Sequence, residues 1–119
     1  VKMPVINYKK TFSQALKVMN QKKLGIAVIT KNKFILGLVT DGDLRRELNK
    51  RLPTKNLKNF IKKRPLIVNE NMPASKALRI MSDKKITSLL VVSDKDLKNK
   101  YQVLKGIIHI HFLLQNGIK

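Results

Sequence analysis

Hydrophobic and polar positions along the chain switch between helical and strand spacing in a fixed order. Ala15 and Met19 recur at the spacing of one helix face. Just before them, Thr11 and Gln14 have the form of a capping box, in which the threonine hydroxyl accepts from the N–H three residues on. The pattern therefore predicts a helix from this box to about residue 23.

Two apolar runs follow this helix. Residues 26–30 are apolar and β-branched, and residues 34–39 form a second run after the polar turn at 31–33. Two such runs around a short polar turn predict an antiparallel hairpin. Asp41 or Asp43 then stands where it can cap a second helix that runs to about residue 48.

The second half of the chain follows the same order. Residues 66–68 are predicted as a short strand, and Pro73 stands in the first turn of the next helix, where its missing N–H is tolerated. Residues 86–92 and 101–110 are then expected to pair as strands across a polar loop. A last helix is predicted to open at Phe112 and to end at Gly117.

The two halves also match residue by residue. Residues 15–19 return as residues 77–81, at an offset of 77 − 15 = 62, whereas residues 37–44 return as residues 106–113, at an offset of 106 − 37 = 69. The second copy therefore carries 69 − 62 = 7 extra residues between its apolar runs. A repeat of this size predicts two similar units that pack together, with paired clefts for ligands at their junction. Between the copies, residues 50–64 predict a polar linker with one helical turn.

Composition is that of an ordinary globular protein. The 119 residues are 43% hydrophobic and include no stretch of about 20 apolar residues and no signal-peptide pattern, which argues against a membrane span. The absence of cysteine excludes disulfides and thiolate chemistry and is compatible with a reducing cytosol, so we expect a cytoplasmic protein. Because the first residue is valine, we expect the chain to be part of a longer protein.

The formal charge of +19 is the strongest compositional bias. A charge of this size is typical of nucleic-acid binding. However, only five of the 26 positive residues are arginine, the usual reader of phosphates and bases, and the six aromatic residues do not alternate with the basic runs. We therefore interpret the lysines as a solvated surface, which still concentrates anionic ligands near the protein.

The doubled strand–helix–strand–strand–helix unit resembles the CBS domain pair, the regulatory module named after cystathionine β-synthase. Residues 15–19 and 77–81 match the Ala-Leu-x-x-Met helix of that family, and residues 37–43 match its Gly-apolar-apolar-Thr-x-x-Asp motif at the end of a strand. The resemblance implies an α+β fold of two βαββα repeats packed with pseudo-twofold symmetry. The expected parts are a first repeat at residues 1–52, a linker at residues 53–63 and a second repeat at residues 64–119.

Further motifs resemble one branch of this family, the bacterial arabinose-5-phosphate isomerases. These motifs are residues 40–46, 85–88 and 106–111, together with the apolar segment 3–5. In those enzymes, which feed the synthesis of Kdo for lipopolysaccharide or capsule, a catalytic sugar-isomerase domain precedes the CBS pair. The resemblance implies that this chain is not itself an enzyme and that its parent protein interconverts arabinose 5-phosphate and ribulose 5-phosphate.

The candidate ligand site lies where the first hairpin gives way to the second helix. Backbone N–H groups at a helix start attract anions, and the Thr40 hydroxyl can add a hydrogen bond to a phosphate. The resemblance to nucleotide-binding CBS modules implies that Asp43 accepts from both ribose hydroxyls of a nucleotide. Alternatively, Asp43 serves only as a helix cap.

The same motif supplies further candidates, namely Asp41, Gly42, Arg45 and Arg46. A second carboxylate beside a phosphate is repulsive unless Asp41 points away. One of the two arginines can bind a phosphate through two parallel hydrogen bonds. Either arginine can equally be a solvated surface charge.

The second copy departs from this pattern. Phe112 stands where the first copy has Asp43, and His109 stands where it has Thr40. A phenyl ring cannot hydrogen-bond a ribose, although it can stack on a base, so we expect one principal ligand site. His109 and His111 are two apart on a predicted strand and should face one side. Two imidazoles can chelate a metal, but no third ligand is evident, so we interpret them as polar residues of the cleft and expect no metal site.

The sequence leaves three functions open. The first is a regulatory module that holds no permanent cofactor, binds a small anionic ligand such as AMP, ATP or a cytidine-linked sugar acid, and reports to its own catalytic domain. The second is a ligand-free module that joins copies of the enzyme into a homodimer or larger assembly through exposed apolar helix stripes. The third, a nucleic-acid-binding module, is disfavoured by the shortage of arginine and aromatic residues. The exposed apolar stripes that the second function requires are expected around Leu16, Leu44, Leu78 and Leu113.

Overall fold

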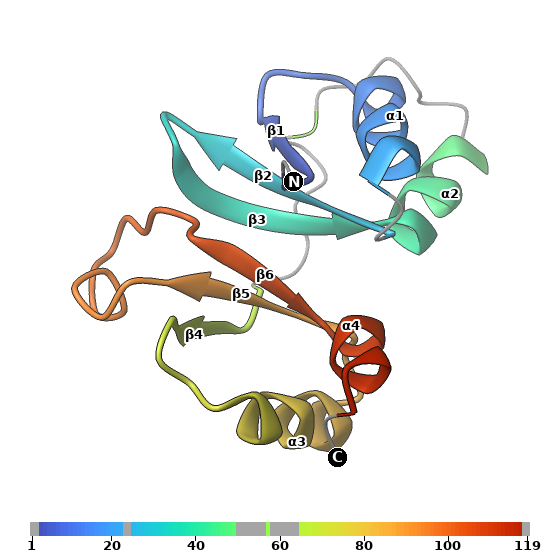
Figure 1. Cartoon of the computed structure of the whole chain (residues 1–119). Helices are drawn as coiled ribbons and strands as arrows, with labels where there is room; N and C mark the ends of the chain where they lie inside the picture. The colour runs from blue at the N-terminus through green and yellow to red at the C-terminus, as the bar shows by residue number, and fades with distance from the viewer. Residues whose placement is uncertain (1–2, 23–24, 50–56, 58–64, 118–119) are drawn as a thin grey trace. The chain divides into compact units, whose positions relative to one another are not determined.

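The computed structural model describes residues 3–22, 25–49, 57 and 65–117, and the chain divides into two compact units (Figure 1). Unit 1 is Val1–Arg64 and unit 2 is Pro65–Lys119. Among the described residues, each unit has one three-stranded sheet and two α-helices. The predicted α+β class and the doubled order of strand, helix, strand, strand and helix are therefore confirmed.

Unit 1 is built around a central strand that pairs with one neighbour on each side. Its elements are β1 (Val5–Asn7), α1 (Phe12–Lys22), β2 (Ile26–Lys31), β3 (Phe34–Thr40) and α2 (Asp41–Asn49). The central strand β2 pairs in parallel with β1 and antiparallel with β3. The predicted hairpin is tight because Asn32 and Lys33 both have positive φ, 51° and 67°, as a two-residue type I′ turn requires.

Helix α1 begins at the predicted capping box. The Gln14 N–H donates to Thr11 Oγ at 3.4 Å, and the Thr11 N–H donates to Gln14 Oε1 at 3.0 Å. This reciprocal pair satisfies two donors that a helix start leaves without a partner in the helix itself. The predicted start of this helix is therefore confirmed.

The core of unit 1 joins one face of α1 to the sheet. Its buried members are Ile6, Phe12, Ala15, Met19, Ala27, Ile29, Val39 and Leu57. Leu57 falls within the segment predicted as a linker, yet it is fully buried, and its N–H donates to the Lys10 carbonyl at 3.0 Å. The rest of residues 53–63 lies outside the described residues.

Unit 2 repeats this layout. Its elements are β4 (Ile67–Asn69), α3 (Ala74–Lys84), β5 (Ser88–Val92), β6 (Gly106–His109) and α4 (Ile110–Gln115). The central strand β5 pairs in parallel with β4 and antiparallel with β6. Its core joins both helices to the sheet through Val68, Ala77, Met81, Leu89 and Leu113. Pro73 is the N-cap of α3, one residue before its predicted place in the first turn.

The seven extra residues of the second copy belong to a folded loop between β5 and β6, residues 93–105. Asp96 is the centre of this loop: Oδ2 accepts from the Val103 N–H at 3.1 Å, and Oδ1 accepts from Asn99 Nδ2 at 3.1 Å. Gln102 Nε2 adds a hydrogen bond of 3.0 Å to the Asp96 carbonyl. The loop extends to residue 105, so β6 begins only at Gly106 and is shorter than predicted.

The predicted apolar helix stripes are not exposed as expected. Leu113 is only 7% exposed and belongs to the core of unit 2, so the prediction is wrong at this position. The reason is that α4 begins two residues earlier than predicted, which turns Leu113 toward the sheet. Leu16 and Leu78 are half-buried against the cores of their units, and the side chain of Leu44 lies outside the described part of the structure.

Candidate ligand site

The site predicted around Thr40 lies where β3 passes directly into α2. Thr40 is the last residue of β3 and pairs with Ile26 of the buried strand β2. The next N–H, that of Asp41, donates to the Gly25 carbonyl at 2.9 Å. The sheet therefore fixes the position of the first turn of α2.

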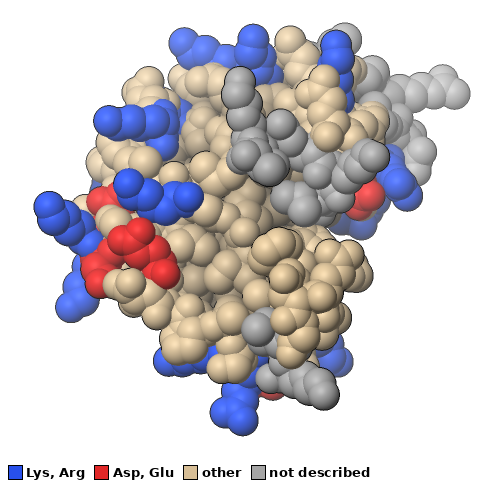
Figure 2. Space-filling model, viewed as in Figure 1, with Lys and Arg blue, Asp and Glu red and all other residues tan. Residues whose placement is uncertain are grey.

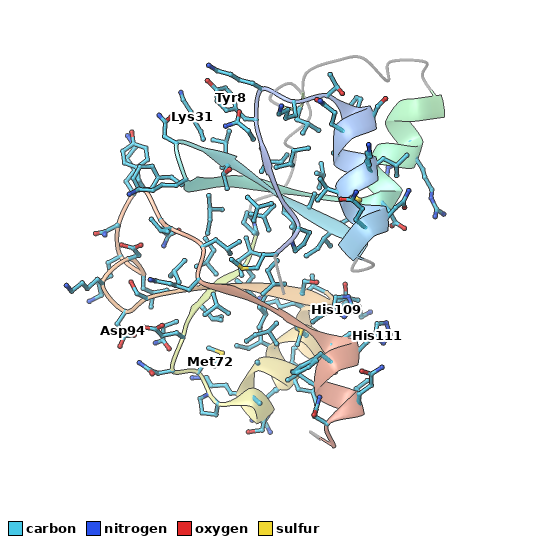
Figure 3. All side chains as sticks on the ribbon, turned by 45° about the horizontal axis from the view of Figure 1, so that its top comes forward. Tyr8, Lys31, Met72, Asp94, His109 and His111 are labelled. Carbon is cyan, nitrogen blue, oxygen red and sulfur yellow. The ribbon has the colours of Figure 1, made fainter. Side chains whose placement is uncertain are left out.

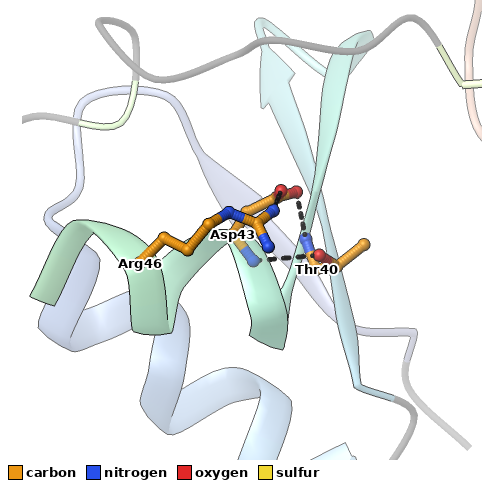
Figure 4. A network of polar contacts seen from close by, with 3 residues as sticks. All are labelled: Thr40, Asp43 and Arg46. Atoms are coloured by element: carbon orange, nitrogen blue, oxygen red, sulfur yellow. Dashed lines mark hydrogen bonds and ion pairs between the residues drawn. The ribbon is translucent and has the colours of Figure 1, made fainter. Parts of the chain in front are cut away.

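Thr40 and Asp43 hold each other by two reciprocal hydrogen bonds (Figure 4). The Asp43 N–H donates to Thr40 Oγ at 3.1 Å, and the Thr40 N–H donates to Asp43 Oδ2 at 3.1 Å. This is a capping box with aspartate as its acidic member. The N-cap is Thr40, so the prediction that Asp41 or Asp43 occupies the cap position is wrong. The helix begins at Asp41, one residue earlier than a cap at Asp41 requires and three earlier than a cap at Asp43 requires.

Of the two arginines that follow, Arg46 reaches this network. Its guanidinium donates to Asp43 Oδ1, three residues back on the helix (Figure 4). The other candidate, Arg45, instead pairs with Asp41: its Nη2 atom lies 3.5 Å from Asp41 Oδ2, and the two side chains are 75% and 48% exposed. The spacing of three residues from Asp43 is the sequence signal that distinguishes Arg46, because residues three apart share a helix face.

The Asp43 carboxylate is held in its ionised form. Its partial burial raises the pKa, but hydrogen bonds from Thr40 and the charged guanidinium of Arg46 outweigh this effect and place the pKa below the usual value. Only 16% of the Asp43 side chain is exposed. The site therefore contains a fixed anionic acceptor at the start of a helix.

Gly42 adds no side chain to the first turn of α2. A Cβ atom at this position would lie 3.6 Å from Arg46 Nη1 and 3.8 Å from Thr40 Oγ, which is ordinary van der Waals contact. Backbone geometry therefore does not demand glycine here. The same distances show that the guanidinium and the threonine hydroxyl both border the surface over Gly42. The structure thus brings together Thr40, Gly42, Asp43 and Arg46, with Asp41 and Arg45 paired beside them.

The histidines of unit 2 meet for a reason different from the predicted one. His109 ends β6 and is the N-cap of α4, and His111 lies in the first turn of that helix, so the prediction that both lie on a strand is wrong. The His111 N–H donates to His109 Nδ1 at 3.2 Å, and the two rings stack with centroids 5.0 Å apart (Figure 3). Phe112 follows with 64% of its surface exposed. This region offers imidazole rings and a phenyl ring in place of a hydroxyl and a carboxylate.

Ser88 is a further polar residue at this end of unit 2, and the sequence analysis did not select it. It pairs with His109 across β5 and β6, which places the two side chains on one face of the sheet. Its hydroxyl oxygen is buried and has no hydrogen-bond partner among the described residues. The corresponding position in unit 1 is Ile26, so this hydroxyl is specific to unit 2.

The described residues limit other kinds of site. They contain no group of three or more His, Cys, Asp or Glu side chains that could hold a metal ion. Within them, every helix is too short or too polar to cross a lipid bilayer.

Figure 2 shows lysine and arginine side chains in several separate groups on the face in view. The aromatic ring of Tyr8 has two lysine neighbours: the Lys31 and Lys9 ammonium groups lie 5.4 and 5.9 Å from its centroid (Figure 3 labels Tyr8 and Lys31).

A family model for the CBS domain matches residues 2–50 and 57–111. The chain belongs to the CBS domain family. The two matched segments cover the elements of unit 1 and most of those of unit 2, and the Thr40–Asp43 network lies in the first. The family resemblance on which the sequence analysis relied is therefore confirmed.

Two relatives of this CBS chain are arabinose 5-phosphate isomerases. The probable enzyme of Haemophilus influenzae is 35% identical over 98 residues, which are 80% of this chain and 29% of that protein. The enzyme of Escherichia coli is 34% identical over 115 residues, which are 92% of this chain and 33% of that protein. The chain thus spans about a third of the length of the curated relatives it matches.

Solved CBS structures share the fold at lower identity. A CBS-domain protein of Agrobacterium tumefaciens superposes with a TM-score of 0.80 at 17% identity and covers 98% of this chain and 90% of its own. A CBS domain protein of Pyrobaculum aerophilum in complex with AMP gives a TM-score of 0.75 at 24% identity and covers 95% and 86%. Both are similar in architecture to this chain.

Proposed function

We propose that this CBS pair is the regulatory module of an arabinose 5-phosphate isomerase-like enzyme and that it binds a nucleotide or nucleotide-sugar at Thr40 and Asp43. Support comes from the isomerases among its relatives and from the AMP complex of a protein with the same fold. In this proposal the ligand is a regulator, the catalytic domain belongs to the parent protein, and the module reports ligand binding to that domain.

The observation that carries the proposal is the Thr40–Asp43 network. A ribose offers two neighbouring hydroxyl donors, and Asp43 is an ionised acceptor held in place by a backbone N–H. A phosphate suits the start of α2, where the helix dipole and the Thr40 hydroxyl favour an anion. Both parts of a nucleotide thus find complementary groups within one turn of helix.

Unit 2 is proposed to contribute less to ligand binding. His109 and His111 can contact an anion or a base, but Phe112 cannot accept from a ribose. We therefore assign one principal site to unit 1 and a weaker role to the histidines.

Calorimetry with AMP, ATP and a cytidine-linked sugar acid tests the site. Asp43→Asn keeps the size of the side chain and an acceptor for the Thr40 N–H but removes the charge. Hydrogen bonds to charged groups are worth roughly 1.5–3 kcal/mol, so we expect affinity to fall about tenfold or more. Asp41→Asn is the matched control, because Asp41 pairs with Arg45 outside the network, and it should leave affinity unchanged. Equal affinity of the parent chain and Asp43→Asn for the ligand that binds would refute the site.

The same protein preparation tests the assignment of catalysis to another domain. Among its described residues we identify no pair of side chains placed for the acid–base chemistry of aldose–ketose interconversion. The purified chain should therefore fail to convert arabinose 5-phosphate, as followed by a ketose assay. Measurable turnover by this chain alone would contradict the proposal.

An oligomerisation role is the second candidate, and one observation favours it. Phe112 and Leu114, two residues apart on α4, are large apolar side chains that are 64% and 54% exposed. We propose that these exposed side chains join copies of the module, most simply as a homodimer. Sedimentation of the parent chain and of Leu114→Lys tests it, because the substitution should shift the chain toward monomer. A strict monomer at high micromolar concentration would count against this role.

A further inference from the structure

Both oxygens of the Asp43 carboxylate are engaged in the structure. Oδ2 accepts from the Thr40 N–H at 3.1 Å, and Oδ1 accepts from the Arg46 guanidinium. A ribose that approaches Asp43 therefore meets a carboxylate whose outer oxygen already has a charged partner. Ligand binding at this carboxylate has to displace or accommodate Arg46.

The two partners of Asp43 differ in how firmly they are held. The Thr40 N–H is a backbone group at the end of a strand, fixed by pairing with β2. The Arg46 side chain is 66% exposed, whereas that of Asp43 is 16% exposed. A mostly solvated guanidinium can exchange one anionic partner for another, whereas a largely buried carboxylate still needs a partner when the guanidinium leaves. Arg46 can therefore leave the carboxylate when another donor replaces it, while the Thr40 N–H cannot move.

The guanidinium also borders the place where a phosphate would bind. A Cβ on Gly42 would touch Arg46 Nη1 and Thr40 Oγ at 3.6 and 3.8 Å, so these two groups flank one small surface at the start of α2. A phosphate on the Thr40 hydroxyl would lie within reach of the guanidinium after a side-chain rotation. Arginine binds phosphate strongly because its planar fork matches two phosphate oxygens.

We propose that Arg46 makes this site select phosphorylated over unphosphorylated nucleosides. An uncharged nucleoside must compete with Arg46 for Oδ1 and offers the guanidinium nothing in return. A nucleotide supplies a phosphate that draws the guanidinium away and frees Oδ1 for the ribose. This inference rests on the proposed function, since it concerns selection at the Thr40–Asp43 site.

Two matched ligand pairs test the selection: AMP with adenosine, and CMP with cytidine. In Arg46→Gln, affinity for the nucleotide should fall about tenfold, because a charge-assisted contact to phosphate is lost, while affinity for the nucleoside should stay equal or rise. The ratio of nucleotide to nucleoside affinity should therefore fall at least about tenfold. Arg45→Gln is the control, because it makes the same change of charge on the neighbouring residue and should keep the parent ratio. An unchanged ratio in Arg46→Gln would overturn the inference and leave the proposed ligand site intact.

A second measurement does not depend on nucleotide binding. Inorganic phosphate is titrated into labelled protein at constant ionic strength, and the NMR signals of the Asp43 carboxyl carbon and the Arg46 Nε are followed. Both signals should move with phosphate in the parent chain, and the carboxyl signal should not respond in Arg46→Gln. Silence of both signals in the parent would overturn the inference. A response to phosphate together with no binding of any nucleotide or nucleoside would refute the proposed function, and selection with it, and leave only the contact of Arg46 with phosphate.

Discussion

At the end of β3 and at the end of β6, a strand passes into a helix without a loop, and a polar side chain caps the helix in both units. In unit 1 the Thr40 hydroxyl accepts from Asp43, the third residue of the helix. In unit 2 the His109 ring accepts from His111, the second residue. The third residue of that helix is Phe112, whose side chain is exposed and cannot accept a hydrogen bond from the N-cap N–H.

The two helix starts agree at the N-cap position and differ at the third position of the helix. Both helix starts need an acceptor at the N-cap, and either a hydroxyl or an imidazole nitrogen supplies it. Neither start fixes the residue at the third position, since aspartate and phenylalanine both occur there. This position can therefore change the chemistry of the site without changing the fold.

The largest effect should come from the core methionines that the two units share. Met19 and Met81 occupy equivalent positions on α1 and α3 and are 2% and 0% exposed. Replacing either by alanine should cost roughly 2–5 kcal/mol in the free energy of unfolding, because a cavity remains. Urea denaturation followed by circular dichroism measures this cost, with the exposed Lys17→Ala as a control near zero. A cost below about 1 kcal/mol in one unit only would show that its core is repacked or poorly formed.

The next effect concerns pH and should appear in unit 1. The pKa of Asp43 lies below its usual value, so its ionised form stabilises the folded state above about pH 3.9, the usual carboxyl pKa, and this contribution is lost as the pH falls further. Asp43→Asn should therefore cost roughly 0.3–1 kcal/mol at neutral pH, because a negative charge near the N-terminus of a helix is lost. The difference from the parent should vanish in acid. Thermal unfolding between pH 2 and 7 measures it, and a difference that grows toward low pH would contradict the assignment.

A smaller effect should follow when unit 2 is made to resemble unit 1. Phe112→Asp places a carboxylate near the N-terminus of α4, which typically adds about 0.3–1 kcal/mol of stability. It also restores an acceptor at the position equivalent to Asp43. Thermal unfolding gives the change in stability, and calorimetric stoichiometry shows whether a second ligand site appears. Phe112→Asn is the uncharged control, and a gain of equal size in both variants would exclude a charge effect.

The smallest effect is expected at Ser88. Its buried oxygen lacks a partner among the described residues, so Ser88→Ala removes an unsatisfied group and creates none. We expect stability to stay within about 0.5 kcal/mol of the parent or to rise slightly. Ser88→Val, which imitates Ile26 of unit 1, tests whether the position also has room. A loss above about 1 kcal/mol on truncation to alanine would mean that the hydroxyl is bonded after all.

Local sequence signals account for most of the fold. The capping box at Thr11, the two-residue hairpin at Asn32 and the repeated helix face through Met19 and Met81 are each encoded within a few residues, and the structure confirms them. The strand predicted from residue 101 is too long, because residues 101–105 belong to the loop around Asp96, whose side chain accepts from the Val103 N–H seven residues further on. Contacts of that kind leave no periodic pattern.

The site was harder to predict than the fold. The motif located Thr40 and Asp43 but left Arg45 and Arg46 open, because the choice requires residues 43–46 to lie within one helix, where the spacing of three brings Arg46 beside Asp43. The same limit affected the histidines, because a helix that starts at Ile110 removes His111 from the strand. Each error is a boundary shift of one or two residues, which rotates side chains to a different face.

The loop around Asp96 has a consequence for how this chain can vary. Asn99, Gln102 and Val103 all donate to Asp96 within residues 93–105, while Asn71 Nδ2 donates to Asp94 and the Lys105 N–H donates to the Val91 carbonyl of β5. Much of the loop is therefore held by its own hydrogen bonds, and β5 and β6 pair in the same register as β2 and β3 of unit 1 despite the longer connection. The connection can therefore lengthen, shorten or accept an inserted reporter peptide while the strands stay paired. It is the natural place for evolution, or a protein engineer, to add new sequence.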